Sequence, residues 1–174
     1  MEENSSIEKP SVMSVSLRYG GIMAVASIAF MMILIAMGAN PFENDWKGWI
    51  SSLITVGILV MAHKYFKDNG DGYMSYGQGL GIGFISILIS IVVGGIFSYV
   101  YANFIDLGIM EDLWQKTTEK MQAQGQSEDT IETAMSWTKK LFWVFYFIGG
   151  AFVALIIALI VSIFTQKKNP EPFA

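Results

Sequence analysis

The stretch LFWVFYFIGGAFVALIIALIVSIFT, residues 141–165, is apolar from end to end and carries no charged side chain. Three more apolar stretches precede it, at residues 17–37, 46–62 and 80–102, and their central residues are also uncharged. At about 1.5 Å of rise per residue, each stretch forms a helix that covers most or all of a hydrocarbon core roughly 30 Å thick. The sequence therefore predicts an all-α integral membrane bundle of four transmembrane helices.

The composition limits what else the chain can contain. It has 174 residues, of which 53% are hydrophobic, so there is room for one small bundle and for no separate soluble enzyme domain. The net charge is -4 and the basic residues are scattered, which leaves no footprint for binding nucleic acid. Cysteine is absent and histidine occurs once, so we expect neither a metal ion nor a cofactor.

The polar segments divide the chain into a single membrane domain, residues 15–166, between a flexible N-terminal tail and a short C-terminal tail, residues 1–14 and 167–174. The first apolar stretch is longer than a signal-peptide core of about 7–15 residues and follows an acidic start, so we expect an uncleaved helix. Gly38 and Pro41 mark its end. Trp46 and Trp49 then lie where an aromatic belt meets the membrane surface.

The one sizeable polar segment, residues 106–140, predicts a helical hairpin outside the membrane between the third and fourth spans. Its first half repeats apolar residues at three- and four-residue intervals, Gly125 breaks the pattern, and Ser127 before two acids is a helix start. From Ser127 the pattern runs into the fourth span without a breaker, so we expect both flanking helices to extend beyond the bilayer. Apolar and aromatic side chains on this hairpin are candidates for a partner surface: Trp114, Met121, Ile131, Met135 and Trp137.

The loop charges favour an orientation with both termini in the cytoplasm. This arrangement places six Lys and Arg residues inside and five Lys residues outside. Two of the outer lysines lie in the long loop far from a span and count for less. Lys139 and Lys140, which adjoin the fourth span, argue for the opposite orientation.

Small residues at four-residue spacing form the strongest pattern in the chain. Membrane helices associate where small side chains let their backbones approach closely. The pattern therefore indicates either packing between the third and fourth spans within one monomer, or a stripe that serves as a homodimer seam or as a docking site for another protein. The residues concerned are Gly79, Gly83, Ser86, Ser90, Gly94, Ser98, Ala102, Gly150, Ala154, Ala158 and Ser162.

Two other features are weak candidates for chemistry. The glycine-rich run Gly77–Gly83 matches neither the dinucleotide fingerprint nor the P-loop, so we expect a flexible helix entry instead. His63 stands at the end of the second span. We expect it to be solvated among the headgroups, with a pH-sensing role as the alternative.

The order of these elements resembles a known family. The glycine-bearing helix entry Tyr76–Gly79, the exit Tyr99–Asp106 and the polar hairpin Met121–Glu128 followed by Thr130–Glu132 are similar to domain of unknown function 4199, a family of four-helix membrane proteins from Bacteroidota. The resemblance implies a bacterial inner-membrane location and a four-helix fold, and no catalytic residue. Family members often carry a proline where this chain has Leu107, so we expect a smoother helix here.

These observations favour a non-enzymatic accessory or scaffold protein of the bacterial inner membrane, which contacts the lipid bilayer and presents its outer hairpin to a partner. The partner is a second copy of the chain or another membrane or periplasmic protein. The alternative is a small transporter or channel subunit for a neutral or amphipathic solute. An enzyme acting on lipid is the least favoured class, because no pair of acid and base suggests itself.

Overall fold

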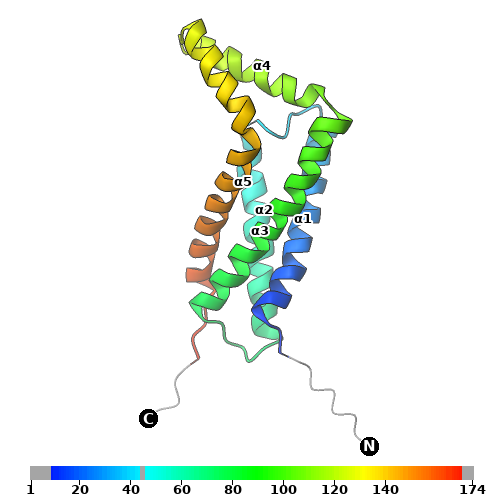
Figure 1. Cartoon of the computed structure of the whole chain (residues 1–174). Coiled ribbons are helices and arrows are strands. Elements are labelled where there is room, and N and C mark those ends of the chain that lie inside the picture. The colour runs from blue at the N-terminus through cyan, green and yellow to red at the C-terminus, as the bar shows by residue number, and fades with distance from the viewer. Residues whose placement is uncertain (1–8, 44–45, 170–174) are drawn as a thin grey trace, which may run out of the picture.

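The computed structural model describes residues 9–43 and 46–169, which fold into a helical bundle (Figure 1). Within this described part of the chain, four helices are long and apolar enough to cross a membrane: α1, α2, α3 with the turn that follows it, and α5. The prediction of an all-α bundle with four such helices is confirmed. The elements are α1 (Val12–Ala36), α2 (Trp46–Asp68), α3 (Tyr76–Val100), the π-helical turn η1 (Tyr101–Ile105), α4 (Gly108–Ala123) and α5 (Glu128–Thr165).

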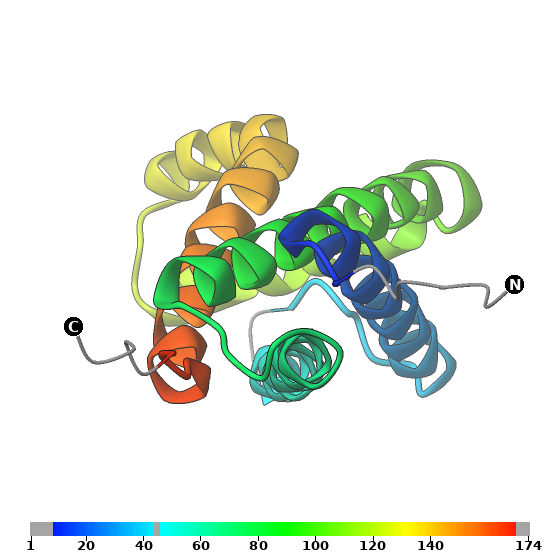
Figure 2. The same cartoon turned by 90° about the horizontal axis from the view of Figure 1, so that it is seen from below.

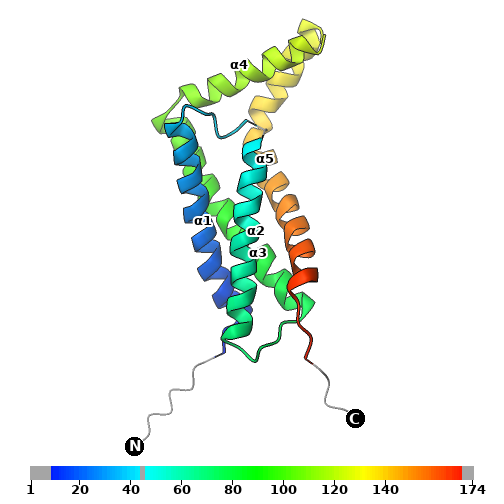
Figure 3. The ribbon, with the colours of Figure 1, turned by 180° about the vertical axis from the view of Figure 1, so that it is seen from behind.

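Helix α3 is the centre of the arrangement. It runs between α1 and α5 and packs most extensively against these two helices. α2 lies to one side of the row formed by α1, α3 and α5 and makes fewer contacts with α3 (Figure 2). α1 begins and α5 ends at the same end of the bundle, and α4 crosses the opposite end (Figure 3). The loop between α1 and α2 therefore lies at the same end as α4.

Helix ends follow the local chemistry. The Ser11 hydroxyl accepts a hydrogen bond from the Ser14 backbone N–H, so α1 begins at Val12, within the predicted tail. Residues 1–8 of that tail and residues 170–174 of the C-terminal one lie outside the described part. α1 gives way to a turn in which Gly38 has a φ of 74°. The hairpin tip also comes where expected, because Gly125 has a φ of 75° and Ser127 caps α5.

The third span does not continue smoothly into the hairpin, and that expectation is wrong. α3 widens into the π-helical turn η1, and the chain then leaves helical geometry at Asp106, where φ is -130° and ψ is 87°. The Asp106 carboxylate accepts a hydrogen bond from the Gly108 N–H at 3.1 Å, which starts α4 in a new direction. α5, in contrast, is one helix from Glu128 to Thr165, as the unbroken sequence pattern predicts.

The expectation that His63 is solvated is also wrong. Its side chain is completely buried and connects three helices near the end opposite α4. Nε2 lies 2.9 Å from the carbonyl oxygen of Gly79 on α3, and Nδ1 lies 2.7 Å from the hydroxyl of Thr165 on α5. Lys67 donates a hydrogen bond to the Thr165 carbonyl at 2.8 Å. These bonds hold the end of α2 against its neighbours.

Small residues bring α3 close to α5. A Cβ atom added to Gly83 would lie 2.9 Å from Cβ of Ala158, and one added to Gly79 would lie 3.1 Å from the Ser162 hydroxyl. Higher in the bundle, Gly150 of α5 faces Ile91 of α3. Ala154 is fully buried in the same core. This contact therefore depends on the absence of larger side chains.

The same stripe on α3 also contacts α1. A Cβ atom at Gly94 would lie 2.9 Å from the Ser27 hydroxyl, and Ser98 lies 3.3 Å from the sulfur of Met31. The Ser86 carbonyl approaches Gly20 of α1 closely. Ala102, which continues the stripe, is buried as well. The predicted packing residues thus lie at contacts within one chain, apart from Ser90, which faces a cavity.

We predict that Gly83→Val destabilises the protein by about 1–3 kcal/mol, because the added methyl groups overlap Ala158 and force α3 and α5 apart. Gly57→Val is the matched control, since a Cβ at this position on α2 meets nothing within 4 Å. Thermal unfolding in mild detergent compares the two variants with wild type. Equal loss of stability in both would contradict the close contact between α3 and α5.

Candidate functional site

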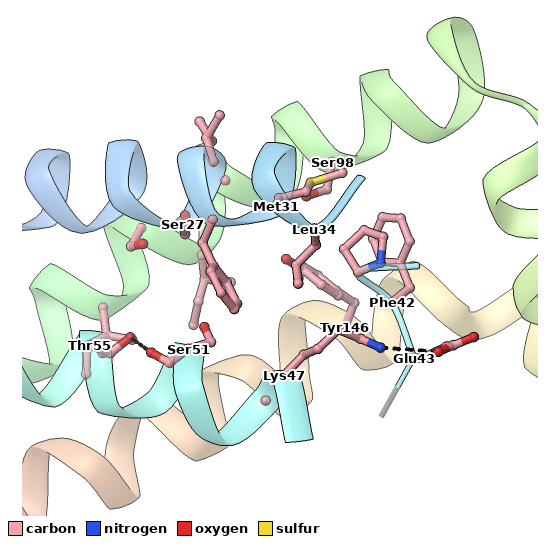
Figure 4. Close-up of a pocket in the computed structure, with 18 residues that line it drawn as sticks. Ser27, Met31, Leu34, Phe42, Glu43, Lys47, Ser51, Thr55, Ser98 and Tyr146 are labelled. Carbon is pink, nitrogen blue, oxygen red and sulfur yellow. Dashed lines mark hydrogen bonds and ion pairs between the residues drawn. The ribbon is translucent and has the colours of Figure 1, made fainter. Parts of the chain in front are cut away.

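A cavity of about 300 Å³ lies inside the bundle near the end covered by α4 (Figure 4). Its walls come from α1, α2, α3 and α5, and its lining also includes Pro41, Phe42 and Glu43 of the loop between α1 and α2. This volume is at the lower end of the range for small-molecule sites. Hydroxyl groups line much of the cavity: Ser27, Ser51, Thr55, Ser90, Ser98 and Tyr146.

An ion pair marks the end of the cavity nearest to α4. Lys47, in the first turn of α2, is only 4% exposed, and its ammonium lies 3.2 Å from Oε2 of Glu43. An ionic group in an otherwise apolar span is costly unless it is paired, and is a marker of function in membrane proteins. The cavity therefore has a charged end and a less polar interior.

The ion pair continues into a polar network that ties the loop to α4. Lys116 of α4 lies 2.7 Å from Oε1 of Glu43 and 2.9 Å from Oδ2 of Asp112. The Asn40 amide donates hydrogen bonds to Asp112 at 3.0 Å and to the Ile109 carbonyl at 2.7 Å. These bonds fasten α4 over the charged end of the cavity.

The polar network changes the pKa values of its ionisable side chains. Hydrogen bonds from Lys116 and Lys47 hold the pKa of Glu43 below its ordinary value of 4.5. The Asn40 amide and the Lys116 ammonium lower the pKa of Asp112 below its ordinary value of 3.8. In return, Glu43 and Asp112 raise the pKa of Lys116 above 10.5. All of these groups are therefore charged at neutral pH.

Aromatic side chains complete the roof beside the polar network. The Phe42 ring contacts Phe142 edge-on, with ring centroids 5.9 Å apart, and contacts Trp143 at 6.0 Å. Trp114 of α4 packs edge-on against Phe142 at 5.3 Å, and Tyr146 lies 5.6 Å from Trp143. Edge-to-face contacts of this kind add to the stability that burial provides. The loop, α4 and α5 therefore meet over the cavity.

Two of the hydroxyl groups that line the cavity are engaged with the backbone. Ser27 donates a hydrogen bond to the Ala24 carbonyl and Thr55 donates one to the Ser51 carbonyl, both at 2.9 Å. No group of three or more His, Cys, Asp or Glu that could hold a metal ion occurs among residues 9–43 and 46–169. The arrangement is suited to holding a molecule with one polar and one apolar end.

The predicted partner surface is mostly enclosed. Ile131 and Met135 are buried in the part of the molecule where α4 and α5 pack together, so they are not surface anchors. Met121 and Trp114 are half-buried, and Trp114 belongs to the aromatic roof. Trp137 alone of the five is exposed, at 61%. The apolar periodicity of the hairpin thus reflects its own packing.

The residues of the polar network are not among those predicted from the sequence. In the sequence, Lys47 contributes only a loop charge to the predicted orientation. Its position four residues after Glu43, in the first turn of an apolar span, was the available signal for an ion pair. Nothing in the sequence links Asn40 to Asp112 and Lys116, because that contact depends on the direction that α4 takes after Asp106.

We predict that acid releases α4 from the loop. The contribution of a carboxylate with a lowered pKa is present above its ordinary pKa and is lost as the pH falls through the lowered value. A nitroxide attached to a cysteine at Gln115, which is exposed on α4, should therefore be more mobile at about pH 3 than at pH 7. Electron paramagnetic resonance of the reconstituted protein measures this mobility.

In Lys116→Met, the label should be mobile at both pH values, because the cation that joins Glu43 of the loop to Asp112 of α4 is gone. Lys120→Met, on the exposed part of α4, is the control and should behave like wild type. Unchanged mobility of the label in Lys116→Met at pH 7 would show that the network does not hold α4.

Comparison with known proteins gives one match. A family model described as protein of unknown function (DUF4199) matches residues 18–167, which include the four membrane-crossing helices almost entirely and every residue of the cavity. No curated protein and no solved structure is similar enough to match. The matched segment covers most of the chain, and the protein therefore belongs to the DUF4199 family of proteins of unknown function.

Proposed function

We propose that this protein is a non-enzymatic membrane protein that binds a small amphipathic molecule in its cavity, as a small transporter or channel subunit does. One observation carries the proposal: a cavity of ligand size, with a buried ion pair at one end, lies within a single chain. The observation favours the second of the two functions expected from the sequence.

The energetic cost of this arrangement supports a role in binding. A bundle built only for stability would fill this space with apolar side chains, since empty volume forfeits packing contacts. The chain instead places Ser51 and Thr55 on successive turns of α2 below Lys47, and all three line the cavity. These small polar side chains leave space for a ligand and provide hydrogen-bonding groups at two levels along the cavity.

The state of the polar groups supports binding rather than catalysis. The Ser27 and Thr55 hydroxyls donate to backbone carbonyls of their own helices, and Glu43 is neutralised by two lysines. A nucleophile needs an adjacent base with a free lone pair. The hydrogen bonds of these groups instead keep them in fixed positions.

We predict that a molecule copurifies with the protein and is lost from Ser51→Phe, because the larger side chain occupies the cavity. Ser52→Phe is the matched control. Ser52 is the next residue on α2, does not line the cavity, and donates its hydroxyl to the Gly48 carbonyl. Mass spectrometry of organic extracts from the purified proteins identifies the molecule.

Loss from Ser51→Phe with retention in Ser52→Phe is the expected result. Identical extracts from wild type and both variants, all folded by circular dichroism, would overturn the proposal that the cavity holds a ligand.

An accessory role through the hairpin is the second candidate function. One observation favours it: Trp137 is exposed on the hairpin, with the Lys140 ammonium 5.7 Å from the centre of its ring. Exposed tryptophan is common at binding hot spots. The surface concerned is smaller than the sequence indicates, because Ile131 and Met135 are enclosed.

For this role we predict that a photo-reactive amino acid at position 137 forms one protein adduct of defined mass in native membranes. The same amino acid at the exposed position of Lys120 is the control and should form none. Adducts with lipid alone at position 137 would assign Trp137 to the membrane surface and contradict the accessory role.

We further propose that the protein lies in a bacterial inner membrane with both termini in the cytoplasm. The family resemblance and the excess of basic residues at the end where α1 begins support this placement. The even number of candidate spans supports termini on one side. In this orientation, α4 and the charged end of the cavity lie on the outer side.

A further inference from the structure

Resting on the proposed function, we infer that the ligand is an uncharged amphipath with a single chain, which enters the cavity from the bilayer between α1 and α2. The inference rests on the shape of the cavity, on its charge balance and on the crevice beside it.

The cavity is elongated along the helices. On α2, Ser51 and Thr55 lie about 6 and 12 Å from Lys47 along the helix axis. On α3, the lining residues extend from Ser98 to Ile87, a span of about 16 Å. A long, narrow space with its ionic groups at one end fits a molecule with a polar head and one chain better than a compact polar solute.

The charges at the polar end are balanced. Glu43 and Lys47 are the charged residues that line the cavity among those described, and they form an ion pair. Lys116 and Asp112, which extend this pair towards α4, add one charge of each sign. A charged head group would add net charge to a site of low dielectric constant, at a large cost in desolvation. A hydroxyl or ester head group can instead donate and accept hydrogen bonds beside the ion pair. The polar end therefore favours an uncharged head group.

A crevice continues the cavity sideways. It lies between α1 and α2, shares Ser27, Phe30, Ser51 and Thr55 with the cavity, and reaches Ala26 and Ile54. Its volume of about 10 Å³ has room for one water molecule at most, so entry requires α2 to move away from α1. α2 is suited to such movement because it packs less extensively against α3 than α1 does.

The end of the cavity below α4 is closed to a ligand. The polar network and the aromatic roof cover this end. Apolar side chains exposed on the two helices, including Val25 and Leu53, face the surroundings and suit contact with lipid. A molecule dissolved in the bilayer therefore meets the α1–α2 crevice directly.

The experiment uses the natural absence of cysteine in this chain. Ala26→Cys is reconstituted into phosphatidylcholine vesicles and then labelled with benzyl maleimide, which obstructs the crevice after the protein has folded. The probe is a monoacylglycerol with a diazirine in its chain, added to the vesicles and photolysed. We expect adducts on the peptides that contain Ser27 and Ser51, reduced about tenfold by the label. The matched control is labelled Ala29→Cys, on the exposed side of α1, which should retain full adduct.

A fatty acid with the same diazirine chain tests the head group when both probes are compared at an alkaline pH, where its carboxyl group is fully ionised even at the membrane surface. We expect it to give less adduct than the monoacylglycerol, and equal or greater adduct would overturn the uncharged class. Full adduct in labelled Ala26→Cys would overturn entry between α1 and α2.

The proposed function is tested separately by the extracts from Ser51→Phe. If neither probe reacts in the cavity but a copurified molecule is lost from Ser51→Phe, the inferred ligand class is wrong and the proposed function stands. If Ser51→Phe also loses nothing, both fail.

Discussion

The close approach of α3 to α1 and α5 is the constraint on which the rest of the structure depends. In lipid, the hydrophobic effect does not drive apolar helices together. They associate instead through van der Waals contact where their backbones approach closely. Gly83 against Ala158 and Gly94 against Ser27 provide that contact on two sides of one helix. With α3 held between α1 and α5, α2 makes fewer contacts with it. The cavity lies on this less closely packed side, where Ser51 and Thr55 take the place of larger side chains.

The α1–α2 loop connects the cavity to the outside of the bundle. Glu43 pairs with Lys47 in the cavity wall and with Lys116 on α4, so one carboxylate joins the membrane domain to the hairpin. The aromatic contacts of Phe42 with α5 reinforce this connection. A ligand at the polar end would touch groups that also position α4. Binding of the proposed ligand would therefore be linked physically to the position of the hairpin, and the two proposed functions of this DUF4199 protein would share one device.

The features that could be predicted from the sequence are those that depend on residues close together in the chain. The hairpin tip at Gly125 and the start of α5 after Ser127 were predicted from the residues that turns and caps require. Prediction failed where a contact needs a partner from far along the chain. His63 was expected to be solvated because its neighbours in sequence suggest a helix end, yet Gly79 and Thr165 enclose it. Ile131 and Met135 were likewise predicted to lie on a partner surface, but α4 packs against α5 and both side chains are buried.

The sequence by itself determined that this protein is a bundle of four membrane-crossing helices with a polar hairpin, because apolar length and helix breakers are properties of the chain alone. Only the tertiary structure decided that the stripe on α3 divides between two neighbours and that Ser90 faces a cavity. It also decided that Asn40 and Glu43 meet α4. These contacts follow from the directions of helices in space, which the turn at Asp106 and the packing of α3 establish together.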